Sequence, residues 1–189
     1  MNTPAHLLIG AALFGKRDHT VLVSGALLGG LLPDISLYLM AGVSLFVLNI
    51  EPQVVFDELY ISDTWQLVFS RDNSFILWLV ALGIAFKYKN AFFIALTCSA
   101  LFHLITDFAL HHDDARVHFW PLSTWKFESP LSYWDSNHHA TFVAPVEGLA
   151  TIAATVYLVA GKLPLLFKIG FIVLLGAELF VLSNWLMHF

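Results

Sequence analysis

Residues 91–110 read AFFIALTCSALFHLITDFAL, an apolar run that contains the imidazole of His103 and the carboxylate of Asp107. A run of about 20 apolar residues is long enough to cross a hydrocarbon core as a helix. An ionisable group at that depth costs several kcal/mol unless it meets a partner, water or a cation, and it is therefore a functional-site hypothesis. This stretch predicts a membrane helix that carries part of a site.

The composition extends this prediction to the whole chain. Of its 189 residues, 58% are hydrophobic and 12% are charged, whereas soluble domains have about 45–50% apolar and about 25% charged residues. Further apolar runs cover residues 20–46, 74–86, 140–160 and 163–187. We expect an all-α, polytopic transmembrane bundle of about six helices, built as a single integral membrane domain over residues 1–189. Residues 49–73 and 111–139 are expected to form polar outer loops.

Two prolines predict features of the first two helices. Thr3 followed by Pro4 favours a helix start, because threonine can cap a helix and proline is tolerated in its first turn. The apolar residues after Pro4 reach only to about Phe14, roughly 18 Å at 1.5 Å per residue, so this helix is expected to be short for a full crossing. Pro33 lies inside the second apolar run and predicts a kink or a break there.

The distribution of basic residues predicts the orientation. Basic side chains occupy alternate connections, and the remaining connections are mainly acidic; the basic residues concerned are Lys16, Arg17, Lys87, Lys89 and Lys162. The positive-inside rule places these connections in the cytoplasm. The N-terminus and both long polar loops are then expected on the periplasmic side of a bacterial inner membrane, and the buried ionisable residues gather in the outer half of the bilayer.

The spacing of His103 and Asp107 indicates that they act together. Residues four apart share a helix face, so the two side chains point the same way, and His111 extends the row if the helix persists. Imidazole and carboxylate together suit Zn, Fe, Ni or Mn in varying degrees, whereas carboxylate-rich sites favour Mn or Mg. The alternative is a histidine hydrogen-bonded to its i+4 aspartate that holds helices together.

Other ionisable residues keep more than one interpretation. His111 and Asp114, in the HHDD segment, can hold a second metal, act as a general base beside a bound one, or mark a helix C-terminus, which favours cationic histidine. Glu147 can be a ligand, a base or a protonated hydrogen-bonding group. Glu178 is expected to form inter-helix hydrogen bonds with Ser183 or Asn184, and His118 is expected to be a solvated loop residue.

Several motifs resemble a known family. His6 in MNTPAHLLIGAAL, LLPDIS at 31–36 and HLITD at 103–107, followed by FWPLSTW, are similar to motifs of the YdjM-type bacterial inner-membrane family, whose members are described as membrane-bound metal-dependent hydrolases. The label CobQ, carried by some relatives, does not fit a helical membrane chain of this size. The resemblance covers roughly residues 1–125.

The resemblance implies His6, Asp34, His103 and Asp107 as metal or catalytic residues. The central His-Arg and Thr-His-Ser element of the family is incomplete here, since SRDNS at 70–74 has no histidine. Asp72 or Asn73 can substitute there as an oxygen ligand, which would shift the preference toward Mn or Mg, or catalysis is lost.

We therefore expect a membrane-embedded hydrolase that uses a divalent metal ion (Zn, Mn or Mg) on a lipid or lipid-linked ester or phosphodiester near the outer interface. The expected metal ligands are His6, Asp34, Asp72, His103, Asp107 and His111. The expected catalytic residues are Asp34, His111, Asp114 and Glu147. The alternative is a non-catalytic scaffold, assembly partner or transporter-like protein. Membrane lipid is the expected partner, and the lack of a basic cluster disfavours nucleic acid.

The predicted orientation can be tested by labelling introduced cysteines. A cysteine at position 114 or 123 should react with an impermeant thiol reagent added outside intact cells, and a cysteine at position 87 should not, because the acidic connections are expected outside. Labelling of position 87 alone would invert the predicted orientation.

Overall fold

The computed structural model describes residues 1–187, and its regular elements in that part are helical. In chain order they are α1 (Thr3–Phe14), α2 (Thr20–Leu31), a 3₁₀ turn (Leu32–Asp34), α3 (Ile35–Gly42), a π turn (Val43–Val47), α4 (Pro52–Val54), a second π turn (Val55–Leu59), α5 (Asp63–Asp72), α6 (Phe75–Lys87), α7 (Ala91–Leu110), a 3₁₀ turn (Ser136–His138), α8 (Ala140–Val159) and α9 (Leu165–Leu186). The predicted all-α bundle of about six helices is confirmed.

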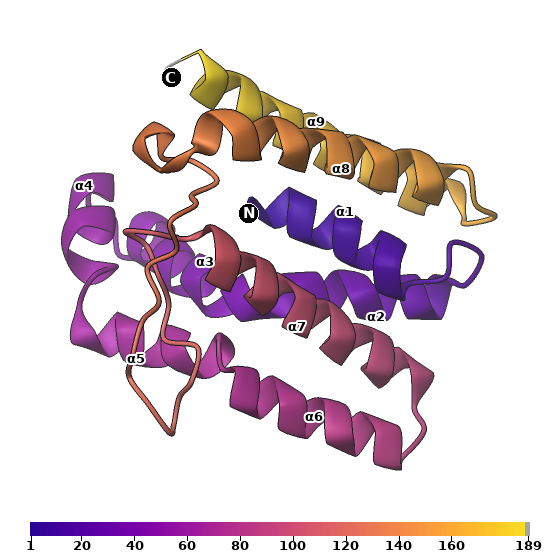
Figure 1. The fold of residues 1–189 in the computed structure, drawn as a ribbon, viewed down its shortest axis with the longest axis horizontal. Helices are drawn as coiled ribbons and strands as arrows, with labels where there is room; N and C mark the ends of the chain where they lie inside the picture. Colours follow the sequence, from indigo (N-terminus) through magenta and orange to yellow (C-terminus); the bar gives the residue numbers. More distant parts are fainter. Residues whose placement is uncertain (188–189) are drawn as a thin grey trace.

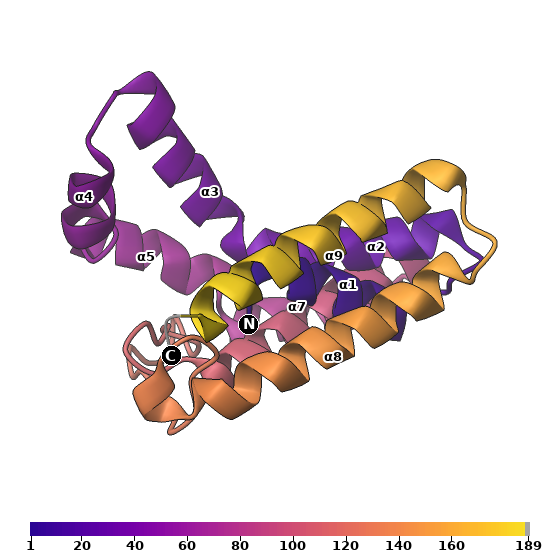
Figure 2. The same cartoon turned by 90° about the horizontal axis from the view of Figure 1, so that it is seen from above.

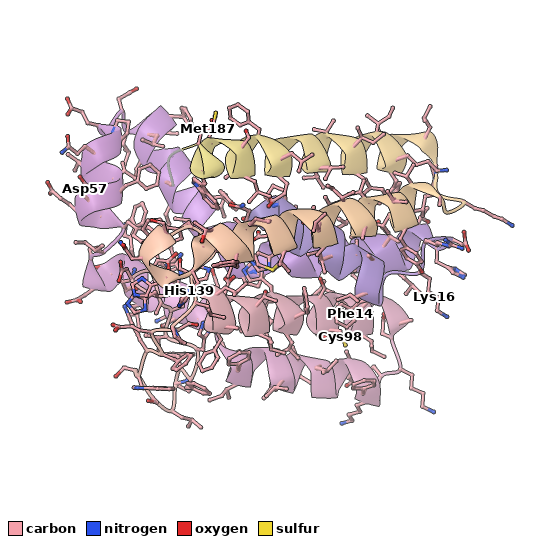
Figure 3. All side chains as sticks on the ribbon, turned by 45° about the horizontal axis from the view of Figure 1, so that its top comes forward. Phe14, Lys16, Asp57, Cys98, His139 and Met187 are labelled. Atoms are coloured by element: carbon pink, nitrogen blue, oxygen red, sulfur yellow. The ribbon has the colours of Figure 1, made fainter. Side chains whose placement is uncertain are left out.

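Five stretches are long and apolar enough to cross a membrane: Thr20–Val47, Asp63–Lys87, Ala91–Leu110, Ala140–Val159 and Leu165–Trp185. In Figure 3, carbon-rich side chains cover the middle of the bundle, and nitrogen and oxygen atoms gather toward its two ends. This distribution is expected for a bundle whose middle lies in hydrocarbon.

The basic connections share one end of the bundle. Figure 1 shows the α1–α2, α6–α7 and α8–α9 connections at that end, with α4 and the long loop before α8 at the other. At the basic end, the Lys162 backbone N–H donates a hydrogen bond to Asp18 Oδ1 over 2.8 Å. The common location of these connections agrees with the charge pattern, and the cytoplasmic assignment of that end stays a prediction.

The short helix α1 lies in the middle of the bundle, in contact with α2, α7, α8 and α9 (Figure 1). Its buried residues Leu8 and Ala11 pack in one apolar cluster with Val23, Leu158 and Phe171. A helix that is apolar on all sides is expected to be enclosed by others. The length expected from the sequence is confirmed at 12 residues, and the first turn of α1 therefore lies inside the protein.

The second run breaks at Pro33, as expected. Proline has no N–H to continue the α-helical ladder, and a 3₁₀ turn joins α2 to α3, which leaves at an angle in Figure 2. Asn73 Nδ2 donates hydrogen bonds to the Pro33 carbonyl over 3.1 Å and to the Phe69 carbonyl over 3.0 Å. The break places Asp34 at the bend.

The segment 49–73 differs from the expected polar loop, because it contains α4, a π turn and α5. Trp65 and Phe69, four residues apart on α5, pack against Ala41 of α3 and against Val55. Polar residues on the other face of α5 lower the average hydrophobicity of the segment, so a prediction based on composition misses this apolar stripe. As a result, α5 and α6 together form one candidate span of 25 residues, longer than the predicted run 74–86.

Small residues allow α2 and α7 to pack closely. A Cβ at Gly29 would overlap the Leu96 carbonyl, and a Cβ at Gly25 would lie 2.7 Å from the Phe92 carbonyl oxygen. Lipid gives little hydrophobic driving force between helices, so close backbone approach is a main source of their association. Gly25 and Gly29 therefore allow the backbones of the two helices to approach.

We predict that Gly29→Ala destabilises the bundle by about 1–3 kcal/mol, the typical cost of overpacking. Gly83→Ala is the matched control, because nothing lies within 4 Å of a Cβ at that α6 position; it should be neutral or stabilising by up to about 1 kcal/mol through helix propensity. The measurement is the unfolding free energy in mixed micelles as the SDS fraction rises. Equal stability of the two variants would contradict the proposed close contact.

Candidate metal centre

The carboxylate of Asp107 lies at the centre of a buried polar cluster. Asp107 Oδ1 lies 2.8 Å from His6 Nε2 and 3.1 Å from His111 Nε2, and Oδ2 lies 3.0 Å from His103 Nε2. The amino group of Met1 is 3.2 Å from Oδ1. His6, His103 and Asp107 are at most 3% exposed. One carboxylate therefore faces three imidazoles away from bulk solvent.

Three local structures bring these side chains together. His103 and Asp107 share a face of α7, which confirms the i, i+4 prediction. His111 comes directly after the last residue of that helix, and its backbone N–H still donates to the Asp107 carbonyl over 3.0 Å. His6 comes from the second turn of α1, which reaches this depth because α1 is enclosed by the other helices.

Hydrogen bonds at Nδ1 fix the tautomers of two imidazoles. His103 Nδ1 lies 2.7 Å from the Gly30 carbonyl oxygen, which can only accept, so Nδ1 carries the proton. His6 Nδ1 lies 3.3 Å from Thr106 Oγ1, and that hydroxyl donates its own proton to carbonyls in the preceding turn. Both Nε2 atoms are then left with lone pairs that face Asp107.

The two imidazole nitrogens and the carboxylate can hold a cation between them. His6 Nε2 and His103 Nε2 are buried and have no hydrogen-bond partner in the described structure. Protonating both would put two positive charges on rings stacked 3.6 Å apart, and like charges at this range oppose each other. Ligand atoms of His6, His103 and Asp107 lie within 4.8 Å of one another. A metal-bound histidine usually donates its other N–H to a carbonyl or similar group, and these three residues therefore fit a metal ion.

Asp34 lies at the edge of this group. Its Oδ1 is 3.7 Å from His103 Nε2, while Oδ2 accepts a hydrogen bond from Thr3 Oγ1 over 2.9 Å. Thr3 Oγ1 also forms a 2.5 Å hydrogen bond with the Tyr38 hydroxyl. The bend after Pro33 thus brings a second carboxylate beside the imidazoles, fixed in place by the first turn of α1.

His111 forms a separate pair with Asp114. His111 Nδ1 lies 3.0 Å from Asp114 Oδ2. Burial opposes the charged imidazole, but the Asp107 and Asp114 carboxylates raise the pKa of His111 above its ordinary value. Burial likewise opposes the charged carboxyl of Asp114, yet the hydrogen bond from His111 holds its pKa below the ordinary range. This pair can hold a proton beside Asp107.

A polar cavity of about 300 Å³ opens onto the cluster. Asp34, Asp107, His111 and Asp114 line it, together with four side chains that the sequence analysis missed: Tyr38, Tyr60, Arg116 and Tyr133. Burial raises the pKa of Tyr60 and raises that of Tyr133 well above its ordinary value, so both phenols remain protonated donors. None of the four side chains belongs to a ligand-like sequence motif. The sequence places them only in segments that adjoin the predicted site residues, which is not enough to predict that they line the cavity.

Two predicted site residues lie elsewhere. Asp72 lies beside Ser36, outside the lining of the polar cavity. Glu147 accepts a 2.7 Å hydrogen bond from the Asn2 backbone N–H and faces Glu178, which accepts from Asn2 Nδ2 over 3.1 Å. These contacts connect α8 and α9 to the start of α1, in agreement with the inter-helix role expected for Glu178.

His118 is buried, in contrast to the solvated loop residue expected from the sequence. It is 2% exposed, and its ring packs against those of Phe75 and Phe108, with centroid distances of 5.2 and 5.7 Å. Nδ1 lies 3.0 Å from the Asn73 carbonyl oxygen. Burial lowers the pKa of His118 to about 4, so the imidazole is neutral near pH 7. Its role is to pack the long loop against α6 and α7.

Comparisons of the chain with protein-family models, curated proteins and solved structures gave no match. The resemblance to the YdjM-type family therefore stays a prediction, and the function is inferred from the cluster itself.

We predict that the purified protein holds about one divalent metal ion per chain. His103→Ala and Asp107→Ala should each lose it, because each removes a ligand. Glu178→Gln should keep it, since the amide oxygen can still accept the hydrogen bond from Asn2. The measurement is elemental analysis of detergent-purified protein, with circular dichroism as a folding control. A folded, monodisperse and metal-free wild type would identify the cluster as inter-helix hydrogen bonding.

Proposed function

We propose that this protein is a metal-dependent hydrolase that acts on an ester or phosphodiester of a lipid or lipid-linked substrate near the outer face of a bacterial inner membrane. The observation that carries the proposal is the pair of buried, unpartnered Nε2 atoms that converge on Asp107. A divalent ion held there would polarise a carbonyl or phosphoryl oxygen and lower the pKa of a bound water.

The donor set bears on which ion is held. Two imidazoles and one carboxylate suit zinc better than Mg. Asp72, the residue expected to shift the preference toward Mn or Mg, lies outside the cavity lining. Among the three ions considered, we propose zinc, with Asp34 as an additional oxygen ligand beside His103.

The protein's own side chains supply the remaining chemistry. His111, oriented by Asp114 at 3.0 Å, is placed to accept a proton beside Asp107. General-base histidines are commonly held by a carboxylate on the other ring nitrogen in this way. The protonated phenols of Tyr60 and Tyr133 line the same cavity and can donate hydrogen bonds to a substrate oxygen.

A second cavity supports an amphiphilic substrate. It has a volume of about 630 Å³ and is lined largely by apolar side chains of α1, α7 and α8, including Ile9, Phe102 and Val146. Met1 lines both this cavity and the polar one. A headgroup in the polar cavity and a hydrocarbon chain in the apolar one would suit a membrane lipid, which is the proposed partner.

The alternative is a non-catalytic scaffold or transporter-like protein. The Asn2, Glu147 and Glu178 contacts favour it, because they show that buried acidic groups in this chain also hold helices together. The tautomers inferred for His6 and His103, with Nε2 of each facing Asp107, support the metal site over that arrangement.

We predict that Asp34→Asn lowers the hydrolytic rate by at least about 10-fold, because it replaces a proposed carboxylate ligand with a neutral amide, and loss of even a group that only supports the ligands typically costs about 10–100-fold. The experiment is lipid profiling of a strain that lacks the gene, complemented with wild type, Asp34→Asn or Asp57→Asn. Asp57 is an exposed carboxylate of the π turn after α4, so its variant is the matched control and should restore the wild-type lipid composition. Equal restoration by Asp34→Asn, or an unchanged lipid profile in the deletion strain, would remove Asp34 from catalysis and favour the scaffold.

A further inference from the structure

Arg116 is a buried cation without an acidic partner. Its residue is 6% exposed, and its guanidinium carbon lies 4.7 Å from the centroid of the Phe69 ring and 5.1 Å from that of Tyr60. Within the described residues 1–187, the structure gives this side chain no hydrogen bond and no ion pair within 4.0 Å. Burying a charge is costly unless it is paired, so the guanidinium N–H groups lack the acceptors that would offset this cost.

The carboxylates near Arg116 contact other groups. Asp114 Oδ2 pairs with His111, Asp107 faces the imidazoles, and Asp34 accepts from Thr3. The second oxygen of Asp114, Oδ1, has no hydrogen-bond partner in the described structure, and Arg116 attracts this carboxylate electrostatically without a direct ion pair. A guanidinium that only balanced these charges would be expected to form a direct pair with one of them. The guanidinium instead contacts two aromatic rings, and arginine often contacts aromatic rings at recognition sites.

The position of Arg116 opens it to a ligand. It lines the 300 Å³ cavity together with Asp34 and Asp107, and it also lines an adjoining cavity of about 100 Å³. The next residue, Val117, forms an antiparallel bridge with Lys126, which anchors this part of the loop. Arg116 is thus a positioned cation in the cavity that contains the candidate metal ligands.

We propose that Arg116 binds a phosphate group in this cavity. Arginine offers a planar set of N–H donors that matches two phosphate oxygens at once. The inference rests on the proposed function for the reaction itself, and it names the substrate class as a phosphodiester rather than a neutral carboxylic ester. The apolar cavity that shares Met1 with this site makes a phosphate-bearing amphiphile the favoured source of that group.

The test is titration calorimetry on the full chain in a neutral maltoside detergent, with and without bound metal. The probes are dodecyl phosphate, inorganic phosphate and the uncharged ester monododecanoylglycerol. Arg116→Gln should weaken dodecyl phosphate binding at least about tenfold, as expected for lost hydrogen bonds to a charged group. Arg116→Lys should lie between wild type and Arg116→Gln, because lysine keeps the charge without the planar fork.

Arg71→Gln is the matched control. Arg71 is an exposed arginine of α5 whose guanidinium carbon lies 5.6 Å from the centroid of the Trp120 ring, and it lines neither cavity, so its loss should leave phosphate affinity unchanged. Binding of the uncharged ester should be the same in all variants. Circular dichroism and metal content show whether each variant keeps its fold.

Equal affinity of wild type and folded Arg116→Gln for dodecyl phosphate overturns the inference. If Arg116→Gln does not fold, equal affinity of wild type and Arg116→Lys overturns it instead. Inorganic phosphate that binds as tightly as dodecyl phosphate, with the same loss on substitution, supports the phosphate site and assigns it to a soluble phosphate. If the protein holds no metal but its phosphate binding depends on Arg116, the phosphate site is supported and the proposed metal-dependent hydrolase is rejected. If the protein binds a metal but its phosphate affinity does not depend on Arg116, the metal centre is supported and the phosphate site is rejected.

Discussion

The buried carboxylate of Asp107 is the constraint on which the arrangement of the polar end depends. A carboxylate and several imidazoles that are almost fully buried among apolar helices must balance their charges and satisfy their lone pairs mainly with one another and with groups in the adjoining polar cavity. This requirement joins three separate parts of the chain: the second turn of α1, the last turns of α7 and the loop residue directly after α7. Two neutral imidazoles whose Nε2 lone pairs both face this carboxylate form a group that can hold a cation.

The backbone of α2 and its break are part of this arrangement. Pro33 ends the regular ladder, and the nearby Gly30 carbonyl accepts from His103 Nδ1 over 2.7 Å. A Cβ at Gly30 would lie 3.0 Å from the His6 carbonyl oxygen, so a small residue at this position allows α1 and α2 to approach where both support the cluster. Local chain breaks and close helix contacts thereby set the tautomer of a side chain on a third helix.

Features that depend on composition and on periodicity along one helix could be predicted from the sequence. The i, i+4 spacing of His103 and Asp107, the break at Pro33 and the short α1 were all found, because each depends on local geometry. Glu147 and Asp72 show the limit. Rise per residue gives depth along a helix, but the rotation of one helix against another comes from packing, and these two carboxylates face Asn2 and Ser36 rather than the imidazoles. Arg116 and Tyr133 had no signal of their own, since only the folded loop brings them to the cavity.

The Glu147–Glu178 pair and the Asp107–Asp34 cluster show why burial alone does not identify a functional site. Glu178 is fully buried, as Asp107 nearly is, but Glu178 is held by the side chain of Asn2, while Asp107 borders a polar cavity and faces unpartnered imidazole nitrogens. Both groups contact residues at the start of α1: Asn2 bonds the glutamates, and Thr3 bonds Asp34. Because one turn of chain joins the two groups, a shift of α1 against α8 and α9 would also displace Asp34 from His103. The glutamate pair therefore supports the geometry of the candidate metal centre, and its structural role and the chemistry of the cluster are physically connected.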